Sequence, residues 1–159
     1  MGLFDLTGKV ALITGSTKGI GKAIAKQMAA SGASVVVSSR NQDACDEVAA
    51  EIQAAGGNAF AKACNINYKE QLQALVDNTI SHFGRIDILV VNAALNPFYG
   101  KSQDIPDEAF DKIMSSNIGS AHRLCQMVVM CWGLTAFPRP QTCKLPETWP
   151  LNGAPAISG

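Results

Sequence analysis

The sequence predicts an α/β domain in which a doubly wound parallel sheet is followed by an irregular tail. Short runs of apolar and β-branched residues recur along residues 1–130, segments of helical period separate them, and glycines end several of these segments. Because strands that alternate with helices pair in parallel through right-handed crossovers, helices should cover both faces of the sheet. The alternation stops near Met130, so we expect a C-terminally truncated sheet.

The four expected strands are short and apolar, as strands buried on both faces should be. They cover residues 9–14, 33–39, 58–64 and 85–91. The expected helices carry apolar side chains at helical spacing. They cover residues 20–31, 41–55, 67–83 and 106–129. Asn67 and Glu70 resemble a capping box at the start of the third helix, and Pro106 suits the first turn of the fourth.

The composition favours one globular domain with a small-molecule partner. The 159 residues are 47% hydrophobic, enough to bury a core, and thirteen basic residues balance thirteen acidic ones. The lack of a basic field argues against nucleic acid or a membrane surface as a partner. No stretch has the length and apolar character of a signal peptide or a membrane helix, so we expect a cytoplasmic protein.

The cysteines form an odd set without Cys-x-x-Cys spacing or neighbouring histidines. They are Cys45, Cys64, Cys125, Cys131 and Cys143. This spacing argues against a zinc site and against a disulfide framework, and it fits a reducing compartment.

Residues 131–159 differ in composition from the rest of the chain. They hold five of the seven prolines and both tryptophans, with few charges and with neither helical nor strand period. A structureless segment of about thirty residues is uncommon in a compact domain. We therefore interpret residues 1–130 as the domain and residues 131–159 as a proline-rich irregular tail, typical of out-of-frame translation or of a truncated chain.

A glycine-rich turn lies between the first expected strand and the first expected helix. After Thr14 it runs Gly15, Ser16, Thr17, Lys18, Gly19, Ile20 and Gly21. Main-chain N–H groups and the helix dipole can hold a pyrophosphate there. Gly15 permits a tight turn, Gly19 lets phosphate approach the backbone, and Gly21 lets the helix pack closely. An ordinary glycine-rich turn is the alternative, but the strand before and the helix after favour a dinucleotide site.

These motifs resemble the classical short-chain dehydrogenase/reductase family, whose fingerprint is Thr-Gly-x-x-x-Gly-x-Gly, over about residues 5–129. Asn92, Ala93 and Ala94 are similar to the family's Asn-Asn-Ala-Gly motif, and Asn117 matches its active-site asparagine. The stretch 91–100 resembles the branch of carbonyl reductases and retinol dehydrogenases.

The resemblance implies a Rossmann-type fold, with the fourth strand at the edge of this sheet. It implies a nicotinamide dinucleotide cofactor and hydride transfer to or from a small carbonyl or alcohol substrate. Family members commonly form homo-oligomers through the helix that carries Asn117 and the helix after it. Asn65 and Ile66, after the third strand, correspond to adenine-binding positions, although Asn65 stands where the family often has Asp.

The residues after the second strand favour NADP(H) over NAD(H). An acidic residue there would bind a ribose 2′-hydroxyl and repel a 2′-phosphate, but this chain has Ser38, Ser39 and Arg40. Arg40 can form a forked pair with phosphate, and Lys18 can add a second positive charge. The family resemblance points the same way. The alternative is that Arg40 and Lys18 are solvated surface charges.

Asn117 is expected on the inward face of the last helix. The expected inward stripe consists of Phe110, Ile113, Met114, Ile118, Ala121, Cys125 and Val128. A buried amide without partners would cost about 1–3 kcal/mol, so a specific hydrogen-bond network should meet Asn117. In the family, this residue holds a water near the catalytic lysine. A purely structural amide, bonded to nearby backbone, is the alternative.

The groups that complete the family's chemistry are missing from the chain as written. Reduction of a carbonyl needs a proton donor, and a phenol serves only if a nearby cation lowers its pKa. The family uses Tyr-x-x-x-Lys with an upstream Ser, whereas neither Tyr68 nor Tyr99 has Lys four residues on. We therefore expect an oxidoreductase by ancestry that is inactive as written. A non-catalytic dinucleotide-binding or interaction module and an unfolded fragment are the alternatives.

Overall fold

The computed structural model describes residues 4–134, and they form one parallel sheet with helices on both faces. The strands are β1 (Val10–Thr14), β2 (Ser34–Ser38), β3 (Asn58–Ala61) and β4 (Ile88–Val90). Their order is β3-β2-β1-β4, with every neighbouring pair parallel. The predicted doubly wound sheet, with its fourth strand at the edge, is therefore confirmed.

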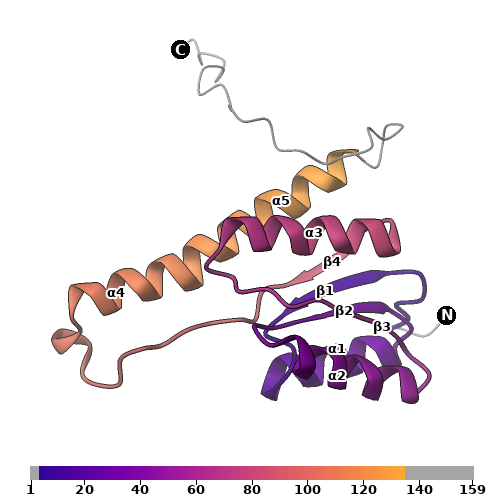
Figure 1. Cartoon of the computed structure of the whole chain (residues 1–159), viewed down its shortest axis with the longest axis horizontal. Coiled ribbons are helices and arrows are strands. Elements are labelled where there is room, and N and C mark those ends of the chain that lie inside the picture. The colour runs from indigo at the N-terminus through magenta and orange to yellow at the C-terminus, as the bar shows by residue number, and fades with distance from the viewer. Residues whose placement is uncertain (1–3, 135–159) are drawn as a thin grey trace, which may run out of the picture.

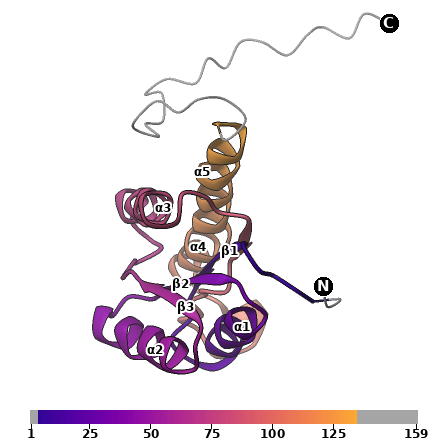
Figure 2. The same cartoon turned by 90° about the vertical axis from the view of Figure 1, so that its right-hand side faces the viewer.

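The helices form two layers, visible in Figures 1 and 2. On one face lie α1 (Gly19–Ala30) and α2 (Gln42–Ala54), and on the other lie α3 (Lys69–Phe83) and α5 (Ser120–Leu134). Successive strand residues point to opposite faces, so Ala11 and Ile13 pack with α1 and α2, while Leu12 packs with α3 and α5. The buried strands thus supply both halves of the core.

The predicted capping box at the third helix is wrong. The helix begins at Lys69 after Tyr68, and no side chain caps it. Instead the Asn67 Oδ1 atom accepts a hydrogen bond of 2.8 Å from the Ser116 hydroxyl. A distant tertiary partner therefore replaces the local one that the sequence suggested.

The long helix predicted over residues 106–129 is composite. It consists of α4 (Asp107–Ile113), a π-helical turn (Met114–Gly119) and α5, preceded by the short 3-10 turn η1 (Ser102–Asp104). Its last turn lies beyond the predicted end, because Cys131 is buried in the core beside α3. Residues 135–159, and with them most of the predicted tail, lie outside the described residues.

The predicted inward stripe of this helix is mostly wrong. Phe110, Met114, Ile118 and Cys125 are exposed. The buried face is turned by about one residue. It consists of Ser116, Ser120, Leu124, Met127, Val128 and Cys131. The segment is apolar on more than one side, so its period alone did not identify which side meets α3.

No helix within residues 4–134 is long and apolar enough to cross a membrane.

Candidate functional site

A cavity of about 500 Å³ opens at the carboxyl ends of the strands. Thr14 and Ser38 end β1 and β2, Cys64 and Asn65 follow β3, and Asn92 follows β4. The chain runs outward from β1 to β3 and then crosses to β4 on the other side of β1. The cavity therefore lies at the topological switch point, where ligands bind in open α/β sheets.

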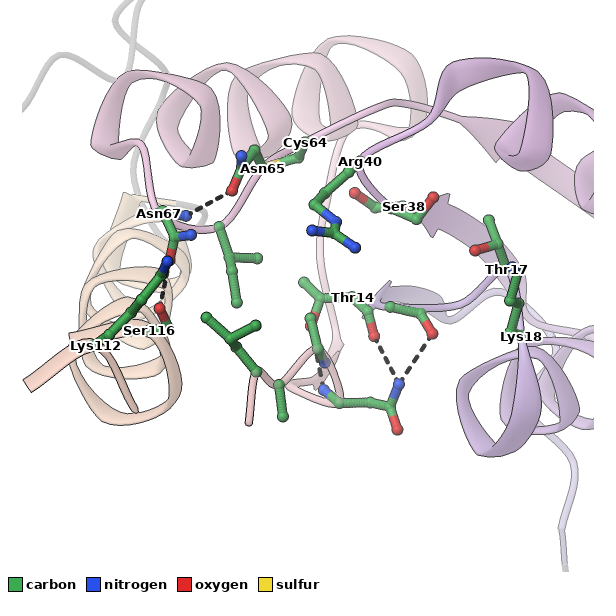
Figure 3. Close-up of a pocket in the computed structure, with 17 residues that line it drawn as sticks. Thr14, Thr17, Lys18, Ser38, Arg40, Cys64, Asn65, Asn67, Lys112 and Ser116 are labelled. Atoms are coloured by element: carbon green, nitrogen blue, oxygen red, sulfur yellow. Dashed lines mark hydrogen bonds between the residues drawn. The ribbon is translucent and has the colours of Figure 1, made fainter. Parts of the chain in front are cut away.

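The cavity gathers most of the predicted site residues. Its lining includes Gly15, Thr17, Lys18, Ser39, Arg40, Asn65, Ile66, Asn92, Ala93 and Ala94. Ser16, Gly19, Ile20 and Gly21 do not line it: the Ser16 side chain is fully buried, and the Ile20 side chain is 74% exposed. Figure 3 shows Lys18 and Thr17 on one side and Asn67 and Lys112 on the other.

Two glycines of the turn are required by close packing. Gly15 has φ +66°, and a Cβ atom there would lie 2.9 Å from both Ala93 Cα and Asn92 Nδ2. A Cβ atom on Gly21 would overlap the Gly15 carbonyl oxygen and lie 2.5 Å from Asn92 Nδ2. Gly19, with φ +51°, has no atom within 4 Å of such a Cβ position. The turn is thus packed tightly on its inner side and open beside Gly19.

The start of α1 has neither a side-chain cap nor a negative charge of its own. Lys18 precedes the helix without a side-chain cap, and the first turn contains no acidic residue. The first N–H groups of a helix need acceptors, and the dipole favours negative charge there. Gly15, Thr17 and Lys18, which come just before this helix, line the cavity, so the start of α1 lies beside it.

The polar network around Asn92 joins the turn to β4. The Asn92 amide donates to the carbonyl oxygens of Thr14 (3.1 Å) and Gly15 (3.0 Å). In return, the Thr14 hydroxyl oxygen accepts from the main-chain N–H groups of Asn92 and Ala93. These bonds attach the predicted Asn92-Ala93-Ala94 motif to the glycine turn, and both segments line the cavity.

The cavity contains cations and no carboxylate among its described lining residues. Lys18, Arg40 and Lys112 line it, and the side chains of all three make no hydrogen bond or ion pair with residues 4–134. Each of these positive charges therefore remains available to an anionic ligand.

Asn117 is half-buried and pairs with the loop after β4, although it does not line the cavity. Its Oδ1 accepts from Leu95 N–H (2.8 Å), and its Nδ2 donates to the Leu95 carbonyl (2.9 Å). These two bonds are the specific network that the sequence predicted for this amide. They fix Leu95, which does line the cavity.

Sequence reasoning missed several lining residues. They are Thr14, Cys64, Asn67, Leu95, Lys112 and Ser116. Thr14 and Cys64 stand at strand ends, a position that could have indicated them. Lys112 and Ser116 come from the long helix, which the family resemblance connected with the site only through Asn117.

The described site holds no acid or nucleophile suited to proton transfer. Burial raises the pKa of the Cys64 thiol to about 11, so it stays neutral. Tyr68 and Tyr99 are exposed and outside the cavity, while His82 stacks on Phe60 with ring centroids 4.4 Å apart. Residues 4–134 bring together no group of three metal-binding side chains. Among the described lining residues there is no tyrosine, histidine or carboxylic acid.

Rossmann-type proteins bind dinucleotides at the topological switch point of the sheet. The parallel sheet and the cavity at its switch point place this chain in the Rossmann-type class. The family model described as short chain dehydrogenase matches residues 9–134, so the chain belongs to this family of oxidoreductases. The predicted family is therefore confirmed.

Individual relatives match the same part of the chain. Dehydrogenase/reductase SDR family member 4 of Oryctolagus cuniculus is 43% identical over 124 residues, which are 78% of this chain and 48% of that protein. The chain thus spans about half the length of the curated relatives it matches.

Two similar solved structures contain nicotinamide cofactors. A 7α-hydroxysteroid dehydrogenase complexed with NADH and 7-oxo glycochenodeoxycholic acid is 44% identical, with a TM-score of 0.75 over 80% of this chain and 49% of that one. A metagenomic short-chain oxidoreductase in complex with NADP is 31% identical, with a TM-score of 0.74 over 82% of this chain and 59% of that one.

Proposed function

We propose that residues 1–130 form the NADP(H)-binding domain of a carbonyl or alcohol oxidoreductase. The observation that carries the proposal is the pairing of the open glycine turn with Lys18 and Arg40 in one cavity without a carboxylate. A dinucleotide fits this donor set, because its pyrophosphate needs N–H groups and a 2′-phosphate needs cations. When bound, NADPH would supply a hydride for a carbonyl carbon.

Each wall of the cavity has its own part in binding. The turn at Gly15 to Gly19 would hold the pyrophosphate, Arg40 and Lys18 the 2′-phosphate, and Asn65 and Ile66 the adenine. The Asn65 Oδ1 atom already accepts a hydrogen bond from the N–H of Asn67 (3.2 Å). The Asn65 NH₂ group would therefore be the one that bonds with the adenine base. Asn117 would act through Leu95 on the nicotinamide side.

We further propose that the 159 residues bind the cofactor without reducing carbonyls. No tyrosine has a lysine four residues later, and no phenol lines the described cavity. Without such a donor, the developing alkoxide has no positioned proton. Cytoplasmic location and a homo-oligomer stay predictions. Exposed Phe110, Met114 and Ile118 support the oligomer.

Fluorescence titration of the chain with NADPH and with NADH tests the binding proposal. We expect NADPH to bind at least about tenfold more tightly, as charge-assisted bonds to a phosphate should give. Arg40→Ala should remove most of this difference by weakening NADPH alone. Arg123→Ala, on α5 outside the cavity, is the matched control. Equal affinities in the wild type, unchanged in Arg40→Ala, would contradict the preference.

Turnover is measured separately, as NADPH oxidation in the presence of a panel of ketones and aldehydes. We expect no oxidation above the rate without protein. Reduction of any carbonyl by this chain would show that a proton donor is present and would overturn the second proposal while leaving the first intact.

A further inference from the structure

The residue before Arg40, Ser39, is hydrogen-bonded to a buried thiol. Cys45 lies in α2 and is fully buried. Its sulfur accepts a hydrogen bond from Ser39 N–H over 3.1 Å, and the Ser39 hydroxyl lies 3.3 Å from the same sulfur. Ser39 is therefore attached to α2 through its main chain and its side chain, one residue before Arg40.

Two further main-chain hydrogen bonds hold Ser38 and Ser39. The N–H of Ser38 donates to the buried Ser16 hydroxyl (2.8 Å), and the Ser39 carbonyl accepts from Cys64 N–H (2.8 Å). The main chain at Ser38 and Ser39 is thus hydrogen-bonded to Ser16, Cys45 and Cys64, whereas the Arg40 guanidinium has no partner among residues 4–134. The direction in which Arg40 leaves the strand end therefore depends on these buried bonds.

We propose that Cys45 is a positioning residue for recognition of the 2′-phosphate, because its sulfur holds Ser39 so that Arg40 is presented to the cavity. This inference rests on the proposed NADPH preference. Burial raises the pKa of the Cys45 thiol, so the neutral sulfur can accept the Ser39 N–H bond without placing a negative charge behind the phosphate site.

Two substitutions separate the hydrogen bond from packing. Valine at position 45 fills a similar volume but has no acceptor, so Ser39 N–H would lose its partner. Serine is smaller but keeps an acceptor, so the bond to Ser39 can form again. A packing role predicts that valine is tolerated better than serine, and a positioning role predicts the opposite order for nucleotide selectivity.

The experiment measures the ratio of NADPH to NADH affinity by fluorescence titration of the full chain. We expect Cys45→Val to lower this ratio about fivefold, the equivalent of one lost hydrogen bond, and Cys45→Ser to stay within about twofold of the wild type. In an Arg40→Ala background, Cys45→Val should leave the ratio unchanged. Cys125→Val, at an exposed thiol on α5, is the matched control.

The outcomes distinguish this inference from the proposed function. A wild type without NADPH preference would overturn both. If the wild type prefers NADPH, two results would overturn the inference alone. One is a folded Cys45→Val variant with an unchanged ratio of NADPH to NADH affinity. The other is a Cys45→Ser variant whose ratio falls as much as that of Cys45→Val. Circular dichroism establishes folding of each variant, and Cys45→Ala replaces Cys45→Val if the latter does not fold.

Discussion

The two walls of the cavity are built in different ways. The glycine-turn wall (residues 14–40) is held by buried bonds, such as Ser38 to Ser16 and Ser39 to Cys45, and by the close approach of Gly21 to Gly15. The helix wall (residues 92–117) consists of an extended loop and α4, which projects beyond the sheet in Figure 1. Asn92 attaches its first residues to the glycine turn, Ser116 bonds to Asn67, and two bonds between Asn117 and Leu95 join its loop to its helix.

Exposure differs between the strand ends of the first wall and the loop and α4 of the second, although Ile20 is exposed in the first and Ser116 is buried in the second. In the glycine-turn wall, Thr14, Ser16 and Ser38 are buried although they are polar, because their groups are paired. In the helix wall, Tyr99 is 90% exposed, and Phe110 and Met114 are exposed as well. We infer that the strand ends of the first wall are rigid and that the second wall is held by a few specific contacts.

The largest effect is expected from Gly21→Ala in the glycine-turn wall. The added methyl group would overlap the Gly15 carbonyl and approach Asn92 Nδ2, neither of which can move freely. We expect a loss of about 2–3 kcal/mol in the free energy of unfolding, measured with urea, and loss of NADPH binding. Gly119→Ala is the control, because its Cβ atom would meet its nearest neighbour at 3.8 Å. Equal stability of the two variants would contradict a tightly packed turn.

A smaller effect is expected from Asn117→Ala in the helix wall. The variant leaves the Leu95 N–H and carbonyl without their partner, and we expect a loss of about 1–2 kcal/mol in the free energy of unfolding. Amide hydrogen exchange should become faster at Leu95 and remain slow at Ser38. Asn78→Ala, at a half-buried helical asparagine bonded only within α3, should change stability little. Unchanged exchange at Leu95 would show that other contacts hold the loop.

The smallest effect concerns Asp87, which joins the edge strand to β1. Burial raises the pKa of this carboxyl, but bonds from Arg85 and from Val10 N–H outweigh it, so the pKa lies below 3.8. A lowered pKa in the folded state stabilises the fold above the ordinary pKa, and this stabilisation is lost as pH falls below about 4.

We expect Asp87→Asn to be less stable than the wild type by about 1 kcal/mol at pH 7, with the difference shrinking below pH 4. Thermal unfolding from pH 7 to pH 3 measures it. Asp111→Asn, an exposed carboxylate on α4, is the control. A difference that stays constant over this range would mean that Asp87 acts through its shape rather than its charge.

Sequence reasoning succeeded where the signals are local. The strands, the glycine turn and the Arg40 position depend on short segments whose chemistry is visible in adjacent residues. It failed at Asn67, where a local capping box was predicted and the side chain bonds instead with Ser116, 49 residues away. Sequence reasoning also predicted the wrong buried face for the last helix. This helix has apolar side chains on several sides, so its helical period does not show which side faces the core.

By itself, the sequence determined the layered fold, the family and the glycine-rich turn after the first strand, since strand composition, helical period and glycine geometry are properties of short segments. Only the tertiary structure decided which side of the long helix is buried, that Lys112 and Ser116 join the cavity, and that Cys45 supports Ser39. The physical reason is that these relations arise between elements distant in the chain, where packing and hydrogen-bond pairing select one arrangement among several that the local pattern allows.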